Sequence, residues 1–251
     1  MDRKSKVRSN GFEFDGVKTG LALTMRRNKN ILVAAVLGAV VGVLGVNLAR
    51  RFKTHLPSLI FDPALLAHHR YVFPVIPWVL FSLYWEAAAK DAAAAKSSET
   101  IASRRVHVFL ANVALLLQIA PLRGLGLFLA PSILSLAGGL AIEMIGLFLA
   151  IWARRALGRN WSGEISIKVE HQLIRSGPYK ILRHPIYTGL LAMYVGGALA
   201  MGSWLAIVGL AMAGFAYWRK IRLEEKNLEV AFGADYEEYR RETWALVPGL
   251  F

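Results

Sequence analysis

Apolar runs separated by short polar segments dominate the chain. The clearest run covers residues 31–49 and contains no charged residue. About 20 apolar residues in a helix cross the hydrocarbon core of a bilayer. The pattern therefore predicts an all-α integral membrane protein with about six transmembrane helices, the last two joined by Gly202 as a tight hairpin. The five runs that follow the first are residues 71–89, 106–122, 132–153, 186–201 and 203–218.

The composition supports a membrane protein. Of the 251 residues, 55% are hydrophobic and 19% are charged. Such a chain is too apolar to be disordered and is unusually apolar for a soluble domain. It contains no cysteine, which excludes disulfides, thiol nucleophiles and cysteine-ligated metal sites. The adjacent pair His68 and His69 is weak evidence for a metal site, so no metal is expected.

Basic residues set the expected orientation in the membrane. The chain has 30 Lys and Arg against 17 Asp and Glu, which gives a net charge of +13. Most of these cations fall at residues 1–30, 90–105, 154–183 and 219–241, which share one membrane side if six helices cross. Short cytoplasmic segments are rich in Lys and Arg, so both termini are predicted to be cytoplasmic. Because the cations flank apolar runs, the charge indicates topology rather than nucleic-acid binding.

Three regions are expected along the chain. Residues 1–30 form a basic cytoplasmic arm suited to anionic lipid headgroups. Residues 31–105 hold the N-terminal membrane helices and a cytoplasmic helical extension, because the alanine-rich segment 86–96 has strong helix propensity. Residues 106–251 form the membrane core and the C-terminal cytoplasmic helices.

The two polar segments on either side of the predicted hairpin lie on the same membrane face, so we expect them to be close together. Pro185 marks the start of a helix, because proline is favoured in the first helical turn. Free backbone N–H groups at a helix start attract carboxylates or phosphates. Arg183, His184 and Tyr187 are therefore candidates to converge on an anionic ligand, the alternative being a basic membrane anchor with an interfacial tyrosine.

Two further glutamate positions stand out. Lys220 and Glu224 are four residues apart and share a helix face, whereas Glu225 is expected to turn away. As an isolated pattern, this pair is also typical of a solvated helix. Glu143 lies in the middle of the fourth apolar run, where a charge costs roughly 3 kcal/mol, so it is expected to face protein or water rather than lipid.

Several short motifs occur together in the second half of the chain. In order, they are His171-Gln-Leu-Ile-x-x-Gly177-x-Tyr179, Arg183-His184-Pro185-x-Tyr187-x-Gly189, Glu224-Glu225, Phe232-Gly233-x-x-Tyr236-x-x-Tyr239 and Val247-Pro248-Gly249. With this combination, the chain from about residue 150 onward resembles the isoprenylcysteine carboxyl methyltransferases, and it is most similar to prokaryotic members. The Arg-His-Pro-x-Tyr element alone is shared with related membrane enzymes.

The resemblance implies an S-adenosylmethionine-dependent membrane methyltransferase whose cofactor pocket is cytoplasmic and formed by the segments flanking the hairpin. Lys220 stands where family enzymes that act on prenylcysteine hold the substrate with an arginine, and Lys220 and Arg222 are the expected catalytic residues. The acceptor would be lipophilic or lipid-linked, for example a prenylcysteine-type carboxylate, and the location a prokaryotic cytoplasmic membrane. The implied cofactor contacts are His171, Leu173, Ile174, Tyr179, His184, Pro185, Ile186, Tyr187 and Glu224.

Other functions stay open at this point. Methylation of a phospholipid amine is one, because related families share the cofactor motif. A sterol-type reductase that uses NADPH also carries Arg-His-Pro-x-Tyr, but the Glu224-Glu225 and Phe232-Gly233 pairs and the lack of cysteine favour methyl transfer. A non-catalytic channel or scaffold would not need so many His, Tyr, Glu and Arg residues in two segments that the topology brings together.

Overall fold

A computed structural model of the chain describes part of the sequence. The described residues are 72–88, 95–98, 100–119, 126–127, 129–130, 132–161, 166–168 and 173–249. All of them belong to one compact unit, Pro57–Phe251. The predicted basic arm, the first apolar run at 31–49 and His171 lie outside the described residues.

Six α-helices account for most of the described residues; five of them lie at the five predicted apolar runs that follow residues 31–49, and the last is polar. Two single-turn helices, η2 (Gly158–Asn160) and η3 (Gly177–Lys180), lie between α5 and α6. The α-helices are α3 (Val75–Ala88), α4 (Ile101–Ile119), α5 (Ile133–Leu157), α6 (Pro185–Met201), α7 (Trp204–Phe232) and α8 (Ala234–Glu242).

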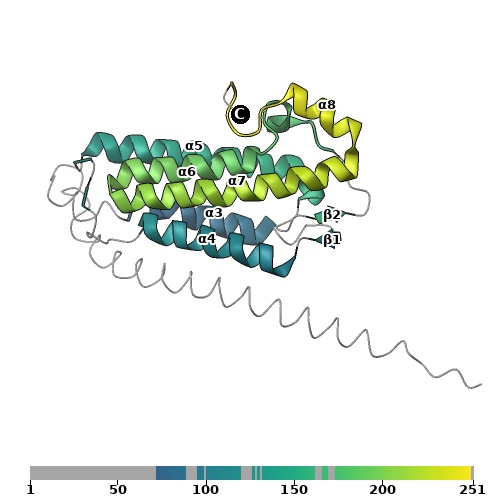
Figure 1. Cartoon of the computed structure of the whole chain (residues 1–251). Coiled ribbons are helices and arrows are strands. Elements are labelled where there is room, and N and C mark those ends of the chain that lie inside the picture. The colour runs from purple at the N-terminus through teal and green to yellow at the C-terminus, as the bar shows by residue number, and fades with distance from the viewer. Residues whose placement is uncertain are drawn as a thin grey trace, which may run out of the picture. The chain divides into compact units, whose positions relative to one another are not determined.

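The structure departs from an all-α fold in one small sheet. Strand β1 (Ala95–Ser98) pairs antiparallel with β2 (Ser166–Lys168). The expectation of one helix through residues 86–96 is therefore wrong, since α3 ends at Ala88 and the chain is extended from Ala95. Pairing with a segment distant in sequence overrides local helix propensity here, which is a weak preference. The sheet lies at the same end of the bundle as α8 (Figure 1).

The predicted hairpin is confirmed. α6 ends at Gly202, whose positive φ of 59° is the left-handed conformation that glycine adopts without strain. α7 then begins after Ser203, whose side chain accepts a hydrogen bond from the backbone N–H of Leu205. The second helix of the hairpin does not stop where its apolar run ends at residue 218, but continues to Phe232. This continuation carries Lys220, Glu224 and Glu225 beyond the apolar half of α7.

α5 and α6 pack at unusually short range. Gly139 on α5 lies against Gly196 on α6, and Gly146 lies against Gly189. A Cβ added at Gly139 would lie 2.5 Å from the Gly196 carbonyl oxygen, and one added at Gly189 would lie 2.5 Å from the Gly146 carbonyl oxygen. On both helices the two glycines are seven residues apart and so share a face. The resulting close contact supports the start of α6, where the candidate site lies.

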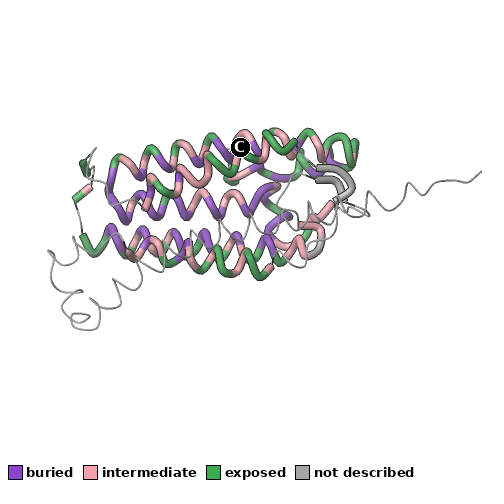
Figure 2. Tube along the Cα trace, turned by 90° about the horizontal axis from the view of Figure 1, so that it is seen from below, coloured by how far each residue is buried: buried purple, intermediate pink, exposed green. Residues whose placement is uncertain are grey.

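Buried residues line the inner faces of the helices (Figure 2), and many large apolar residues are exposed on the outside of the bundle. Leu134, Ile145 and Phe148 of α5 and Phe215 of α7 all expose more than half of their surface. Among the described helices, α5 is the one long and apolar enough to cross a membrane, with a mean hydropathy of 2.1, and α3 and α6 are shorter apolar helices. Glu143 in α5 is fully buried inside the bundle, which confirms that it faces protein rather than lipid.

Candidate functional site

The first turn of α6 begins where the sequence predicts. His184 is the N-cap residue and Pro185 is the first helical residue. The His184 ring is buried and stacks on Tyr187, with 5.8 Å between the ring centroids. Thr188 Oγ1 donates a hydrogen bond to the carbonyl oxygen of Leu246, 2.8 Å away. The start of α6 is thus held against the C-terminal segment.

Two carboxylates of α7 flank the His184 ring. Nε2 lies 3.3 Å from Oε1 of Glu225, and Nδ1 lies 3.7 Å from Oε2 of Glu224. Because a carboxylate oxygen only accepts hydrogen bonds, Nε2 carries a proton. Arg183 Nε donates to the same Glu225 oxygen over 3.0 Å. Arg183 and His184 therefore meet on a carboxylate of the protein itself, in place of the external anion expected from the sequence.

The expectation that Glu225 turns away from the site is wrong. α7 is continuous through both glutamates, and successive residues differ by about 100° around a helix, so Glu224 and Glu225 approach His184 from either side. Burial raises the pKa of Glu225, but hydrogen bonds and charges from His184 and Arg183 outweigh burial and lower the pKa to about 2. Glu225 is therefore an ionised group that orders both basic side chains.

Glu224 differs from Glu225 because it has a buried carboxylate oxygen that accepts no hydrogen bond from the described residues. Oε2 of Glu224 is buried, and no hydrogen-bond donor within the described ranges reaches it. Tyr179 and Tyr187 lie close enough to interact electrostatically with this carboxylate. Burial raises the pKa of Tyr179, and the charge of Glu224 raises it further, so Tyr179 keeps its hydroxyl proton. Since a buried acceptor without a donor is costly, Oε2 of Glu224 is a point at which a ligand's donor fits.

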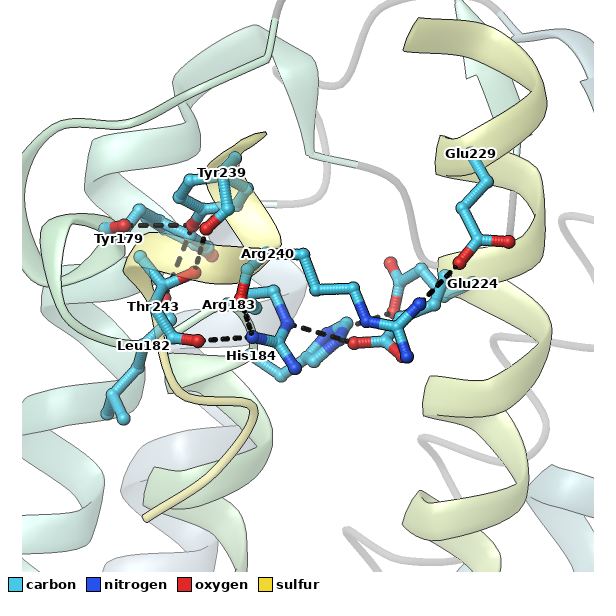
Figure 3. Close-up of polar contacts among 10 residues, drawn as sticks. Tyr179, Leu182, Arg183, His184, Glu224, Glu229, Tyr239, Arg240 and Thr243 are labelled. Carbon is cyan, nitrogen blue, oxygen red and sulfur yellow. Dashed lines mark hydrogen bonds and ion pairs between the residues drawn. The ribbon is translucent and has the colours of Figure 1, made fainter. Parts of the chain in front are cut away.

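The C-terminal segment covers this cluster. Tyr239 of α8 donates from its hydroxyl to the carbonyl oxygen of Tyr179 over 2.8 Å (Figure 3). The backbone N–H of Arg183 donates to the carbonyl of Trp244 over 2.7 Å, and that of His184 donates to Ala245 over 3.1 Å. Residues 60 or so positions apart are thereby fixed side by side, as the predicted topology requires. The Arg183 guanidinium also donates to the backbone carbonyls of Arg240 and Thr243.

A row of rings leads from the α6 start to α4. Tyr187 stacks on Tyr217 of α7, with 5.3 Å between centroids, and Tyr217 meets the edge of the His107 ring at 5.4 Å. His107 Nδ1 lies 3.3 Å from the carbonyl oxygen of Ala216. Neither Tyr217 nor His107 is among the residues expected from the sequence. Tyr217 could have been found seven residues before Glu224 on the same helix face, whereas His107 lies on another helix and gives no such signal.

The two expected catalytic residues are placed differently. Lys220 is buried on the α7 face that also carries Tyr217 and Glu224. Arg222 is exposed, with its guanidinium carbon 5.7 Å from the ring centroid of Trp218. Hence the structure brings Lys220, but not Arg222, to the side of the site.

The other expected contacts lie close to this cluster in the chain. Leu173 and Ile174 are half-buried just before η3, and Ile174 packs against the main core. Pro185 and Ile186 are buried in the first turn of α6. His171 lies outside the described residues, so its predicted contact stays a prediction.

A further group, also missed from the sequence, lies at the end of α5. Arg154 is buried and its guanidinium carbon stands 4.4 Å from the ring centroid of Trp161. Trp161 in turn meets the ring of Trp85 edge to face at 5.3 Å. Arg154 acts electrostatically on Tyr179, which places a buried cation beside the site.

Known proteins that are similar to this chain include methyltransferases. The chain is 33% identical over 113 residues to the probable protein-S-isoprenylcysteine O-methyltransferase of Oryza sativa subsp. indica, which is 44% of this chain and 59% of that protein. It is 43% identical over 75 residues to methanethiol S-methyltransferase 2 of Bradyrhizobium diazoefficiens, 29% of this chain and 27% of that protein. The chain thus spans less than two thirds of the length of these relatives.

A solved structure of the eukaryotic intramembrane Ras methyltransferase, an isoprenylcysteine carboxyl methyltransferase, aligns with a TM-score of 0.48 and 16% identity, over 76% of this chain and 74% of that one. Residues 134–235 match the phospholipid methyltransferase family, and this range contains His184, Tyr187, Lys220, Glu224 and Glu225. The resemblance predicted from the motifs is therefore confirmed: residues 134–235 match the phospholipid methyltransferase family, and the chain is similar to isoprenylcysteine O-methyltransferases.

Proposed function

We propose that this protein is an integral membrane methyltransferase that transfers the methyl group of S-adenosylmethionine to a lipophilic acceptor, with a prenylcysteine-type carboxylate as the leading acceptor. The observation that carries the proposal is the leftover oxygen of Glu224. It is a buried carboxylate oxygen without a donor, in a cluster with His184, Tyr179 and Tyr187 inside the matched family region.

The chemistry of these side chains fits S-adenosylmethionine. Glu224 can accept hydrogen bonds from the ribose hydroxyls or the ammonium group of the donor. Tyr179 offers a ring face and a hydroxyl to the adenosyl part, and Tyr187 extends the same surface toward Tyr217. Leu173, Ile174, Pro185 and Ile186 would supply the apolar part of the surface, with His171 as a further contact.

When bound, S-adenosylmethionine supplies an electrophilic methyl group on a sulfonium. The protein's part is to hold the two reactants in contact and to exclude water. A carboxylate acceptor needs no general base, because it is already ionised. The C-terminal segment, tied to Tyr179, Arg183 and His184 by hydrogen bonds, covers the cluster and would shield it from solvent.

Lys220 is the residue that favours an acidic acceptor. Its side chain is buried on the same α7 face as Glu224, one helical turn away. A cation in that place attracts a carboxylate and repels a phospholipid ammonium group. Methylation of a phospholipid amine, the activity suggested by the name of the matching family, is the second candidate, because Lys220 would repel such an acceptor. Arg222 would act only after moving from its exposed position beside Trp218.

The outward-facing apolar residues and the hydropathy of α5 support a protein embedded in the membrane. We propose a multi-pass arrangement in a prokaryotic cytoplasmic membrane with both termini inside. The acceptor would then reach Lys220 laterally from the bilayer. Neither nucleic acid nor a metal ion has a part in this proposal.

Direct ligand binding tests the proposal. Purified protein in detergent is titrated with S-adenosylmethionine and, separately, with NADPH, and wild type is compared with Glu224→Ala and Tyr187→Phe. We expect S-adenosylmethionine to bind and both substitutions to weaken it. Binding of NADPH without binding of S-adenosylmethionine would replace the methyltransferase by a sterol-type reductase. Thermal stabilisation that rises with ligand concentration provides an independent readout.

A further inference from the structure

Tyr236 is a buried tyrosine that the proposed contacts leave out. It lies in the first turn of α8 and exposes none of its surface. Its hydroxyl has no hydrogen-bond partner in the part of the chain that the structure describes. A buried hydroxyl without a partner is costly, and such groups in native structures call for an explanation.

The position of Tyr236 is fixed by its neighbours on α8. Tyr239, three residues on, donates to the carbonyl of Tyr179, and Arg183 donates to the carbonyl of Arg240. These bonds tie α8 to the segment that leads into α6. Tyr239 therefore uses its hydroxyl to hold the structure together, whereas Tyr236, on the same short helix, has a hydroxyl that nothing in the described chain uses.

The surroundings of Tyr236 are those of the candidate site. It interacts electrostatically with Glu225, Arg183 and Glu224. Oε1 of Glu225 is engaged, because Arg183 and His184 both donate to it. Oε2 of Glu224 lies 3.7 Å from His184 Nδ1, beyond hydrogen-bond distance, and accepts no hydrogen bond in the described ranges. Two buried oxygens beside the site, the Tyr236 hydroxyl and Glu224 Oε2, thus have hydrogen-bonding capacity that the described residues do not use.

We propose that Tyr236 and Glu224 together bind the α-ammonium group of the amino-acid part of the methyl donor. This inference rests on the proposed function and assigns one end of the ligand within it. A primary ammonium carries three N–H donors and a positive charge, so it can donate to the Tyr236 hydroxyl and pair with Glu224 at once. A ligand carboxylate is disfavoured beside Glu224, because the charge of Glu224, unlike that of Glu225, is not offset by Arg183 and would repel it.

Two nucleoside ligands test this assignment without any methyl transfer. S-adenosylhomocysteine carries the amino-acid ammonium, whereas 5′-methylthioadenosine has the same adenosyl group and no amino acid. Their dissociation constants are measured by calorimetry on full-length protein in detergent, for wild type and Tyr236→Phe. We expect Tyr236→Phe to weaken the binding of S-adenosylhomocysteine roughly tenfold or more, as loss of a hydrogen bond to a charged group does. Binding of 5′-methylthioadenosine should change less than about twofold.

Tyr239→Phe is the matched control, because it removes a tyrosine hydroxyl of α8 that bonds to the protein. It should lower the thermal midpoint and change the dissociation constants of both ligands by the same factor. If Tyr236→Phe weakens the binding of both ligands equally, or weakens the binding of neither, the inference is overturned. Failure of the wild type to bind either ligand would instead overturn the proposed function, so the two failures are distinct.

Discussion

Arg183 Nε lies 3.0 Å from Oε1 of Glu225, and both side chains are about 90% buried. This pair ties Arg183, two residues before the first residue of α6, to the polar half of α7, 42 positions later in the chain. His184 Nε2 shares the same oxygen at 3.3 Å. The positions of Arg183 and His184 at the start of α6 therefore depend on the carboxylate of Glu225, which the proposed ligand does not need to contact.

We expect Glu225→Gln to destabilise the fold by roughly 3 kcal/mol, because removal of one charge from a buried pair leaves Arg183 and His184 uncompensated. The thermal midpoint in detergent measures the effect. Glu229→Gln is the control, since Glu229 pairs with Arg240 at 2.8 Å but both side chains are more than 40% exposed. Its effect should stay below about 1 kcal/mol. Equal midpoints for the two variants would contradict the structural role of Glu225.

The same carboxylate predicts a dependence on pH. Its pKa is lowered from 4.5 to about 2 in the folded protein by His184 and Arg183, against the raising effect of burial. A group whose pKa falls on folding contributes stability above its unfolded pKa and loses it as the pH falls toward the folded value. The difference in thermal midpoint between wild type and Glu225→Gln should therefore be full near neutral pH and shrink below about pH 4.5. A difference that stays constant down to about pH 3 would rule this linkage out.

The glycine contact between α5 and α6 gives a packing prediction. Gly189→Ala would place a Cβ 2.5 Å from the carbonyl oxygen of Gly146 and 2.8 Å from the backbone nitrogen of Ala150, so the helices must separate. Overpacking of this kind costs about 1–3 kcal/mol. At Gly214 on α7 nothing lies within 4 Å of an added Cβ, so Gly214→Ala should be neutral or stabilising. If the two variants unfold at the same temperature, the close approach of α5 and α6 is disproved.

Local signals in the sequence predicted the parts of the fold that depend on local chemistry. Gly202 ends α6, and His184 and Pro185 start it, because a left-handed turn and a first helical turn each demand particular residues. From the Lys and Arg pattern, the two segments flanking the hairpin were predicted to lie close together. The hydrogen bonds between Arg183 and Trp244 and between Tyr239 and Tyr179 confirm this proximity.

Features that depend on a distant partner were not predictable in the same way. The strand at Ala95–Ser98 forms through pairing with Ser166–Lys168, although its first two residues belong to the segment 86–96, which favours a helix. Glu225 was assigned to the wrong face because the helical face of Lys220 and Glu224 gives no information about Arg183, which arrives from another segment. His107 escaped notice for the same reason, since the ring that it meets, Tyr217, lies on α7.

Lys220 provides the prediction that bears on the acceptor. If the ammonium of this buried side chain attracts an acidic acceptor, Lys220→Met should lower kcat/KM for N-acetyl-S-farnesylcysteine by roughly a hundredfold, because the charge pair with the acceptor is lost. Lys220→Arg keeps the charge and should recover most of the rate, and Lys226→Met, which alters an exposed lysine of the same helix, should not change it. Affinity for S-adenosylmethionine, measured without acceptor, should stay within about threefold in every variant, since the proposed role of Lys220 is to attract the acceptor's carboxylate. The carboxamide analogue of the same prenylcysteine separates charge from shape: a rate that is equal for acid and amide, or unaffected by Lys220→Met, would show that the acceptor is not held by its carboxylate.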